Sequence, residues 1–118
     1  MTRILTGHKV NPANDILEVV AVDGPGPGGA SHVYTITAPN VDVKLEFQNG
    51  PIAETGVNGI TQEALLTILI DRLEGFQSGQ FNCFENDQAL KHLRAAQEIL
   101  HKRTKERMAR GVEGTHQV

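Results

Sequence analysis

Residues 86–110 read NDQALKHLRAAQEILHKRTKERMAR, and this stretch determines the architecture of the C-terminal half. Apolar side chains recur along it at helical spacing, Asn86 or Asp87 is a suitable N-cap, and Gly111 is a stop signal. A helix of about 25 residues is about 37 Å long, about the diameter of a compact chain of this length. The stretch therefore predicts a helix that crosses the whole molecule. Its inner stripe is expected to contain Leu90, Leu93, Gln97, Leu100, Thr104 and Met108.

A shorter helix is predicted before it. Thr61 is the expected N-cap, Glu63 places negative charge in the first turn, and Gly75 and Ser78-Gly79 end the helix. The two helices, joined by about ten residues, predict an αα-hairpin. Because the longer helix extends beyond its partner, part of its apolar stripe needs a second copy, so we expect a homo-oligomer. The apolar face of the shorter helix is expected to contain Leu65, Leu66, Ile68, Leu69, Leu73 and Phe76.

The N-terminal half is predicted to be strands. Residues 16–22 are rich in β-branched and apolar side chains, residues 32–37 alternate, and residues 41–47 place apolar side chains on one face and charged ones on the other. Residues 38–40 and Asn49-Gly50 read as turns. These patterns predict an α+β fold, an N-terminal antiparallel β-sheet followed by a C-terminal αα-hairpin. We expect one domain over residues 1–118, with 1–60 as the β region and 61–118 as the helical hairpin and tail.

The loop between the first two predicted strands contains Gly24, Gly26 and Gly29 at the spacing of a dinucleotide-binding motif. That motif must open a helix, whereas β-branched residues follow here. Pro25 and Pro27 also remove backbone donors that would hold a phosphate. The segment is therefore interpreted as a hairpin loop, with a ligand-covering flap as the alternative.

Composition and charge restrict the class of protein. The chain has a formal net charge of −3, which argues against binding a polymeric nucleic acid, yet residues 102–110 hold five of its eleven Lys and Arg. This local basic stripe favours a small anion. The single cysteine, Cys83, excludes an internal disulfide framework. Residues 1–9 lack the apolar core of a signal peptide and no run resembles a membrane span, so we expect a cytoplasmic protein without a membrane partner.

Two basic side chains are the first candidates for ligand binding. Arg103 and Arg107 are four residues apart, so they share one helix face, which Arg110 continues. Guanidinium groups grip phosphate bidentately, whereas the alternative reading is a solvated last turn that favours the helix dipole.

Aromatic side chains gather near the predicted hairpin turn. Phe76, Phe81 or Phe84 could stack on a nucleobase, or else close the end of the core. Asn86 is either a simple N-cap or an amide that reads a base edge. The site that we expect thus combines a phenyl ring, a side-chain amide and arginine guanidinium groups.

The sequence contains no pattern of catalytic or metal-binding residues. The five histidines are scattered, there is no cysteine pair, and neither serine lies in a nucleophile elbow. We therefore expect a binder rather than an enzyme, with no metal and no cofactor.

The hairpin sequence resembles known families. Residues 86–116, with their spaced leucines, their three arginines and the ending Arg-Gly-Val-Glu-Gly-Thr-His at 110–116, resemble the helical hairpin shared by two phage sponge families. These are the anti-CBASS cyclic-nucleotide sponges and the first family of Thoeris anti-defence proteins. Residues 50–60, which follow a β region, are similar to the Thoeris branch. The likeness covers roughly residues 49–118.

The resemblance implies a function and a set of contacts. It implies sequestration, without degradation, of cyclic ADP-ribose isomers (glycocyclic ADP-ribose) made by TIR-domain immune enzymes. By position in the family motif, Phe76 would stack on adenine, and Asn86, Arg103 and Arg107 would hold base and phosphates. Family members also imply a dimer or hexamer, and a second site for cyclic di- or trinucleotides with Arg110, Thr115 and His116 as candidates. The alternatives are a structural phage protein assembled through its hairpin and an RNA-binding module, the latter weakened by the charge.

Overall fold

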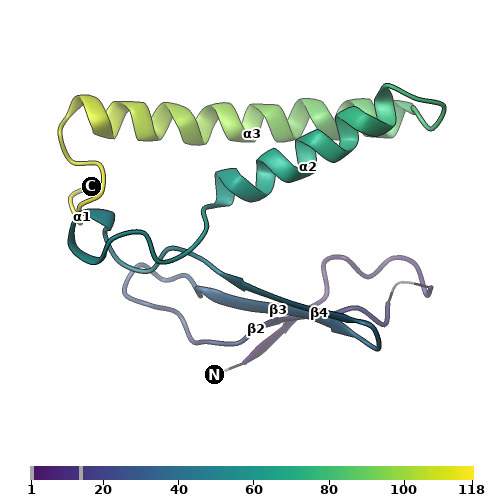
Figure 1. Cartoon of the computed structure of the whole chain (residues 1–118), viewed down its shortest axis with the longest axis horizontal. Coiled ribbons are helices and arrows are strands. Elements are labelled where there is room, and N and C mark those ends of the chain that lie inside the picture. Colours follow the sequence, from purple (N-terminus) through teal and green to yellow (C-terminus); the bar gives the residue numbers. More distant parts are fainter. Residues whose placement is uncertain (1, 14) are drawn as a thin grey trace. The chain divides into compact units, whose positions relative to one another are not determined.

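The computed structural model describes residues 2–13 and 15–118, and it contains a four-stranded sheet followed by three helices (Figure 1). The predicted α+β class is confirmed. The elements are β1 (Arg3–Leu5), β2 (Glu18–Ala21), β3 (Val33–Ala38), β4 (Val41–Glu46), α1 (Ile52–Thr55), α2 (Gln62–Gln77) and α3 (Phe84–Ala109).

The sheet is an antiparallel meander in the order β1-β2-β3-β4. Its register aligns Val19, Ile36 and Val43 across three strands, so these apolar side chains share one face. The predicted alternation is therefore confirmed, and Pro39-Asn40 is the short connection between β3 and β4. The sequence did not predict β1, a three-residue edge strand that pairs with β2.

An aspartate organises the loop between β2 and β3. The carboxylate of Asp23 accepts hydrogen bonds from the backbone N–H of His32 at 2.9 Å and of Val33 at 3.0 Å. These bonds, that from Val33 first, favour the charged form and lower the pKa of Asp23. The glycine-rich segment thus connects two antiparallel strands and opens no helix, as predicted.

The chain returns to the sheet after α1. Residue Ile60 forms a parallel bridge with Phe47, and the side chain of Asn58 hydrogen bonds the backbone of Asn49 at 2.8 and 2.7 Å. Gly59 lies so close to this strand that a Cβ atom would stand 2.5 Å from the carbonyl carbon of Phe47. Residues 57–60 therefore belong to the β region.

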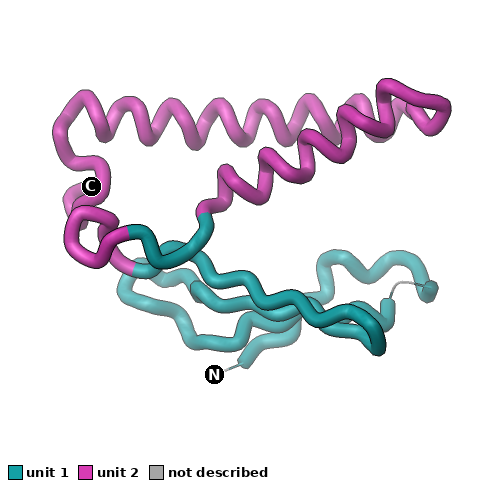
Figure 2. Tube along the Cα trace, in the orientation of Figure 1, with its two compact units in different colours: residues 1–49, 57–60 teal, residues 50–56, 61–118 magenta. Residues whose placement is uncertain are grey.

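The chain divides into two compact units (Figure 2). The first contains residues 1–49 and 57–60, and the second contains residues 50–56 and 61–118. The sheet lies in the first unit, whereas α1, α2 and α3 lie in the second. Among the described residues, none of the helices is both long and apolar enough to cross a lipid bilayer.

Within the second unit, α2 and α3 run antiparallel, side by side, as the predicted hairpin (Figure 1). Thr61 caps α2 as predicted, since its hydroxyl accepts from the Ala64 N–H at 3.1 Å. Helix α2 continues through Gly75 and ends at Gln77, with Ser78 of the predicted Ser78-Gly79 stop as its C-cap. One predicted boundary is wrong, because α3 begins at Phe84 rather than at Asn86 or Asp87.

The reason for the earlier start of α3 lies in the hairpin turn, residues 78–83. The thiol of Cys83 accepts from the Asn86 N–H at 3.4 Å, so Cys83 is the cap. The amide of Gln77 fixes this residue by donating to its carbonyl at 3.0 Å and accepting from its N–H at 2.9 Å. A weak sulfur cap is thus held in place by a glutamine at the end of the preceding helix.

The hairpin buries a thin apolar seam. Leu90 of α3 is 4% exposed and Ile70 of α2 is 8% exposed, although Ile70 lay outside the predicted apolar face. Two polar contacts connect the helices, Arg94 to Glu74 and Gln97 to Thr67, both at 2.8 Å. Many apolar side chains of this unit stay exposed, among them Ile68, Leu69, Phe76, Phe81, Phe84, Ile99 and Met108.

Helix α3 ends as predicted. Gly111 has a φ of +71°, and the N–H groups of Gly111 and Val112 bond the carbonyls of Met108 and Arg107. This is a Schellman motif, in which a glycine adopts the left-handed conformation and reverses the chain. The reversal starts the C-terminal tail, residues 111–118.

Candidate functional site

The two arginines predicted to grip phosphate lie in different environments. Arg103 is exposed on α3, and no side chain of the described part of the chain forms an ion pair or hydrogen bond with it. Arg107, one turn later, is only 8% exposed. The shared helix face follows from their spacing, but only Arg103 offers its guanidinium to solvent.

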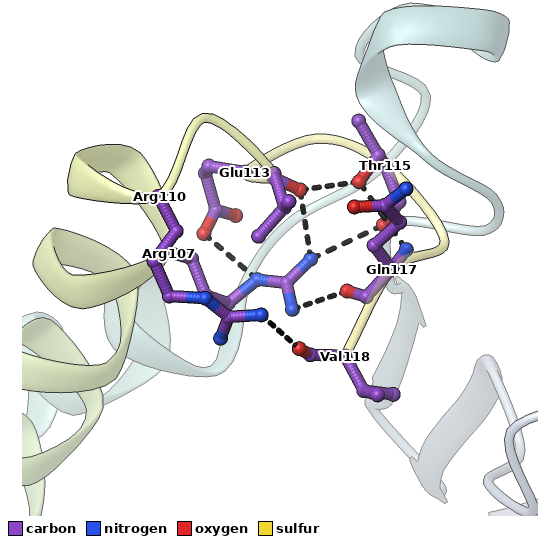
Figure 3. A network of polar contacts seen from close by, with 7 residues as sticks. Arg107, Arg110, Glu113, Thr115, Gln117 and Val118 are labelled. Atoms are coloured by element: carbon purple, nitrogen blue, oxygen red, sulfur yellow. Dashed lines mark hydrogen bonds and ion pairs between the residues drawn. The ribbon is translucent and has the colours of Figure 1, made fainter.

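The C-terminal tail surrounds Arg107 (Figure 3). Its Nε donates to the Glu113 carboxylate at 3.2 Å, and one terminal nitrogen donates to the Gln117 carbonyl at 2.6 Å. The other terminal nitrogen donates to the carbonyls of Val112 at 3.0 Å and Thr115 at 3.2 Å. A single guanidinium therefore binds four residues of the tail.

The candidates for a second site lie on or beside this tail. Arg110 is exposed and donates to the Val118 carbonyl, and the Thr115 hydroxyl donates to the Val112 carbonyl. The imidazole of His116 lies 3.7 Å from the carboxylate of Glu54 in α1. The backbone N–H of Ala53 in α1 also donates to the Gly114 carbonyl at 3.0 Å. The structure thus brings Arg110, Thr115 and His116 to one end of the helical unit.

The aromatic candidates lie at the other end of the hairpin. Phe76 is 42% exposed, while Phe81 and Phe84 are 69% and 70% exposed. The guanidinium carbon of Arg72 stands 5.5 Å from the centroid of the Phe76 ring, a cation–π contact that covers one face. All three phenyl rings therefore present surface to solvent, and Phe76 has a defined neighbour.

Asn86 also belongs to this end. It is half-buried in the first turn of α3, and within residues 2–13 and 15–118 its side-chain amide makes no hydrogen bond. Phe76 and Asn86 therefore lie at the same end of the hairpin, because Gln77 holds Cys83 across the turn.

The predicted residues do not converge within one chain. Asn86 and Arg103 are 17 residues apart on the same straight helix, a separation of about 25 Å. The aromatic and amide candidates thus lie near one end of α3, and the arginine candidates lie near the other. A molecule with one adenine and two phosphates is far too short to contact both groups in a single copy.

Other polar groups do not form a competing centre. A shallow groove along α3 is lined by Glu98, His101, Lys102, Lys105 and Glu106, and its charges are of both signs. None of the predicted site residues lines it. Across the described residues, no cluster of three or more His, Cys, Asp or Glu side chains is arranged to hold a metal ion.

Sequence reasoning missed the partners of Arg107. Glu113 belongs to the family motif at 110–116 but was given no role, Gln117 belongs to no motif, and three of the four acceptors are backbone carbonyls. The available signal was the pair of glycines, Gly111 and Gly114, both with positive φ, which folds the tail back. Such a turn directly after an arginine-rich helix end is a reason to expect that the tail covers one of the arginines.

Comparisons with known proteins agree with this architecture. The family model described as the Acb2/Tad1 hairpin domain matches residues 40–105, which include Phe76, Asn86 and Arg103 but not Arg107 or the tail. The chain is also similar to a protein of Bacillus phage SBSphiJ7 named Thoeris anti-defense 1, with 49% identity over 73 residues. The aligned part covers 62% of this chain and 51% of that protein, so the chain spans about half the length of the curated relative.

Proposed function

Because the chain belongs to the Acb2/Tad1 hairpin-domain family, we propose that it is a phage anti-defence protein that binds and sequesters a nucleotide signal of host immunity. The proposed ligand is a cyclic ADP-ribose isomer, such as glycocyclic ADP-ribose, made by TIR-domain immune enzymes. The printed name of its phage relative supports the Thoeris branch. The proposed place of action is the cytoplasm of the infected cell, where such a signal would accumulate.

The observation that carries the proposal is the separation of the site residues along α3. Two helices that pack antiparallel around a twofold axis place the start of one beside the end of the other. Phe76 and Asn86 of one copy would then face Arg103 of its partner. The apolar side chains left exposed on the hairpin, such as Ile99 at 67%, provide surface for that contact. We therefore propose a homo-oligomer, dimer or hexamer, with ligand pockets between copies.

Each group of such a pocket has a distinct task. The free face of Phe76 would stack on adenine, since Arg72 covers the other face. The unpaired amide of Asn86 would bond the edge of the base, and the exposed fork of Arg103 would bind phosphate oxygens bidentately. An adenine diphosphate ligand needs these three kinds of contact.

Sequestration rather than turnover is the proposed mode of action. No serine or cysteine nucleophile is paired with a histidine base in the described part of the chain, and Cys83 caps α3 through its sulfur. A protein that only binds would protect the phage stoichiometrically, because each site holds one signal molecule and leaves that molecule intact. Cyclic di- or trinucleotides of CBASS systems are proposed as further ligands, at Arg110, Thr115 and His116.

The test is recovery of the ligand. Purified protein is mixed with glycocyclic ADP-ribose, separated from free ligand, heated until it unfolds, and the released nucleotide is analysed by mass spectrometry. The expected result is one intact ligand released per site. Release of ADP-ribose would show turnover, and absence of bound ligand would contradict the proposal.

The exposed apolar side chains of the hairpin also favour a second candidate, a structural phage protein that assembles through this surface. Such a protein would form the oligomer but retain no nucleotide. The same experiment separates the two, because an oligomer without an ultraviolet-absorbing ligand supports assembly alone.

A further inference from the structure

The four-stranded sheet ends in two edge strands, β1 and β4 (Figure 1). Strand β1 has three residues, whereas β4 has six, Val41–Glu46. An edge strand carries unpaired backbone N–H and C=O groups that can pair with another chain, and proteins usually keep such strands short or cover them. Strand β4 is therefore the edge with the larger capacity for pairing.

The C-terminal end of the β4 edge is covered, and the rest is open. The N–H of Ile60 donates to the Glu46 carbonyl, and its carbonyl accepts from the Gln48 N–H, both at 2.9 Å. In an antiparallel strand, the backbone groups of successive residues point alternately to one side and the other. The N–H and C=O groups of Asp42 and Lys44 therefore point away from β3, as those of Glu46 do. In the described part of the chain no strand pairs with them.

The side chains of β4 are exposed as well. Val41 and Val43, on one face, are 37% and 41% exposed, and Asp42 and Lys44, on the other face, are also exposed. Apolar side chains on an open strand edge favour association, because a neighbouring strand removes them from water. Backbone and side chains of β4 thus present a surface of the kind to which a further strand adds.

A second copy of β4 fits this edge in one register. Two copies of one strand pair antiparallel around a twofold axis, and outward backbone groups must meet outward groups. Registers with Asp42 opposite Asp42, or Lys44 opposite Lys44, align like charges, which destabilises a strand pair. A register with Lys44 opposite Glu46 needs the positions that Ile60 already occupies. The remaining register that uses residues 41–45 places Asp42 of each copy opposite Lys44 of the other, and Val43 opposite Val43.

We propose that β4 is a second contact surface between copies of this chain, in which two β4 strands pair antiparallel around Val43 and join two sheets into one. The contact contains about four backbone hydrogen bonds, made by Asp42 and Lys44 of both copies, and a cross-strand ion pair on each side of the axis. On the other face Val43 meets its counterpart, and Val41 meets Leu45. This inference goes beyond the proposed function, because it involves neither the ligand nor the hairpin.

The β4 contact is small, so it acts together with the hairpin contact. Stable interfaces bury about 1,200–2,000 Å² of surface, more than the few residue pairs of two edge strands cover. A chain with two different twofold contacts builds an assembly larger than a dimer, and closure of that assembly into a ring makes each contact intramolecular. Loss of the β4 contact should therefore leave a smaller species that is joined through the hairpin.

Cysteine crosslinking tests the register in the full chain. The background is Cys83→Ser, which keeps a side chain suited to cap α3. Val43→Cys places two thiols opposite each other across the twofold axis, within reach of a disulfide, so mild oxidation should yield a covalent dimer on a denaturing gel. Lys44→Cys is the matched control one residue along the strand. Its thiol faces Asp42 of the other copy, so this variant should run as a single chain.

Exchange of charges tests the ion pairs. Lys44→Asp and Asp42→Lys each align like charges in the self-pair, so the dissociation constant of the β4 contact should rise about tenfold, and light scattering should show a smaller assembly. A mixture of these two variants aligns opposite charges at both positions and should recover the native mass, although every copy keeps its own altered charge. Glu18→Lys, at an exposed position of the interior strand β2, is the control and should keep the native mass.

Several results would overturn the proposal. Crosslinking of Lys44→Cys in place of Val43→Cys, or of neither variant, would contradict the register. A native mass in both single charge variants, or a mixture that stays small, would show that β4 does not join copies and that Lys44 only protects the edge. If a charge variant does not fold, crosslinking still decides, because Val43→Cys keeps both charges. If the native protein binds no nucleotide, the proposed function fails, whereas both tests of the β4 contact stand.

Discussion

Two arginines one turn apart on α3 show how little a side chain's identity says about its role. Arg103 is exposed, whereas Arg107 is 8% exposed and bonded to four residues of the tail. Their Coulomb interactions differ accordingly, since solvent screens Arg103 and the tail encloses Arg107. The exposed guanidinium of Arg103 is therefore the first group to test for ligand binding.

Substitution of Arg103 should weaken ligand binding strongly. Arg103→Ala leaves a phosphate underpaired in a partly desolvated site, which should cost about 2–5 kcal/mol of binding free energy, mainly through faster dissociation. Arg103→Lys should recover little, because the charge remains but the bidentate fork is lost. Isothermal titration with glycocyclic ADP-ribose measures both variants.

The matched control is Lys105→Ala. Lys105 lies two residues from both arginines and lines the shallow groove with Glu98 and Glu106, so it points away from their face. Its substitution should leave affinity nearly unchanged. Equal losses at Arg103 and Lys105 would instead indicate a diffuse basic surface.

A carboxylate in the β region should give the protein a pH dependence. The pKa of Asp23 is lowered by backbone hydrogen bonds from Val33 and His32, so its charged form stabilises the fold. That contribution is complete above about pH 4, the ordinary range of an aspartate, and is lost as pH falls through the lower pKa of the folded state. Asp23→Asn should therefore reduce the loss of the free energy of unfolding as pH falls from neutral to strong acid, which urea unfolding at several pH values measures.

The control for this prediction is Asp71→Asn, at an exposed position of α2. If the free energy of unfolding falls as steeply with acid in Asp23→Asn as in the native protein, the charge of this carboxylate does not stabilise the loop.

At the scale of elements, helices and strands follow local rules, and their ends follow contacts. Thr61 caps α2 and Gly111 ends α3 as their residue types predict. The start of α3 does not follow from its residue types. The side chain of Gln77 makes two hydrogen bonds with the backbone of Cys83, and Cys83 is the N-cap, three residues before Asn86. An amide at the end of one helix thus sets the beginning of the next.

Two glycines should respond in opposite directions to the same substitution. Gly59→Ala would place a methyl group 2.5 Å from the Phe47 carbonyl carbon and 2.7 Å from the Glu46 oxygen, both backbone atoms. The bridge to Ile60 would have to shift, at a cost of about 1–3 kcal/mol of the free energy of unfolding. Denaturant unfolding measures the loss.

Gly75→Ala is the counterpart within α2. Its Cβ would meet nothing within 4 Å, so the change should stabilise the protein by about 0.5–1 kcal/mol through helix propensity. Destabilisation by both variants to the same extent would contradict the role assigned to the close approach at Gly59.

At the scale of the whole molecule, the chain buries little apolar surface for its length. Its described buried apolar side chains are Ala21, Ile70, Leu90 and Val112. Helix α3 has 26 residues against 16 in α2, so it extends about 15 Å beyond its partner. Side chains such as Ile99 and Met108 stay more than half exposed. A second copy would cover this surface.

We expect a stable oligomer, and we expect one charged substitution on the exposed apolar surface of the hairpin to dissociate it. Ile99→Glu should shift the protein toward monomer in light scattering at micromolar concentration, because a carboxylate would be desolvated in the contact. Thermal stability of the native protein should rise with concentration, and that of Ile99→Glu should not. Val10→Glu, at a 90% exposed position of the β region, is the control. A native monomer would contradict the expectation.

The sequence by itself determined the fold class, the strands β2, β3 and β4 of the meander and the existence of the hairpin, because side-chain periodicity, helix caps and turn glycines act between near neighbours. It also placed Phe76, Asn86 and Arg103 on the two helices of the hairpin, and the hairpin-domain family model covers all three residues. Their contacts with a ligand stay predictions.

Only the tertiary structure decided what covers each face. Spacing places Arg103 and Arg107 on one side of α3, but it says nothing of the tail that folds back over Arg107 through two positive-φ glycines. Likewise α1 lacked a sequence signal, yet Ala53 bonds the tail across the unit. Local spacing fixes the direction in which a side chain points, whereas its burial depends on which distant segment arrives there.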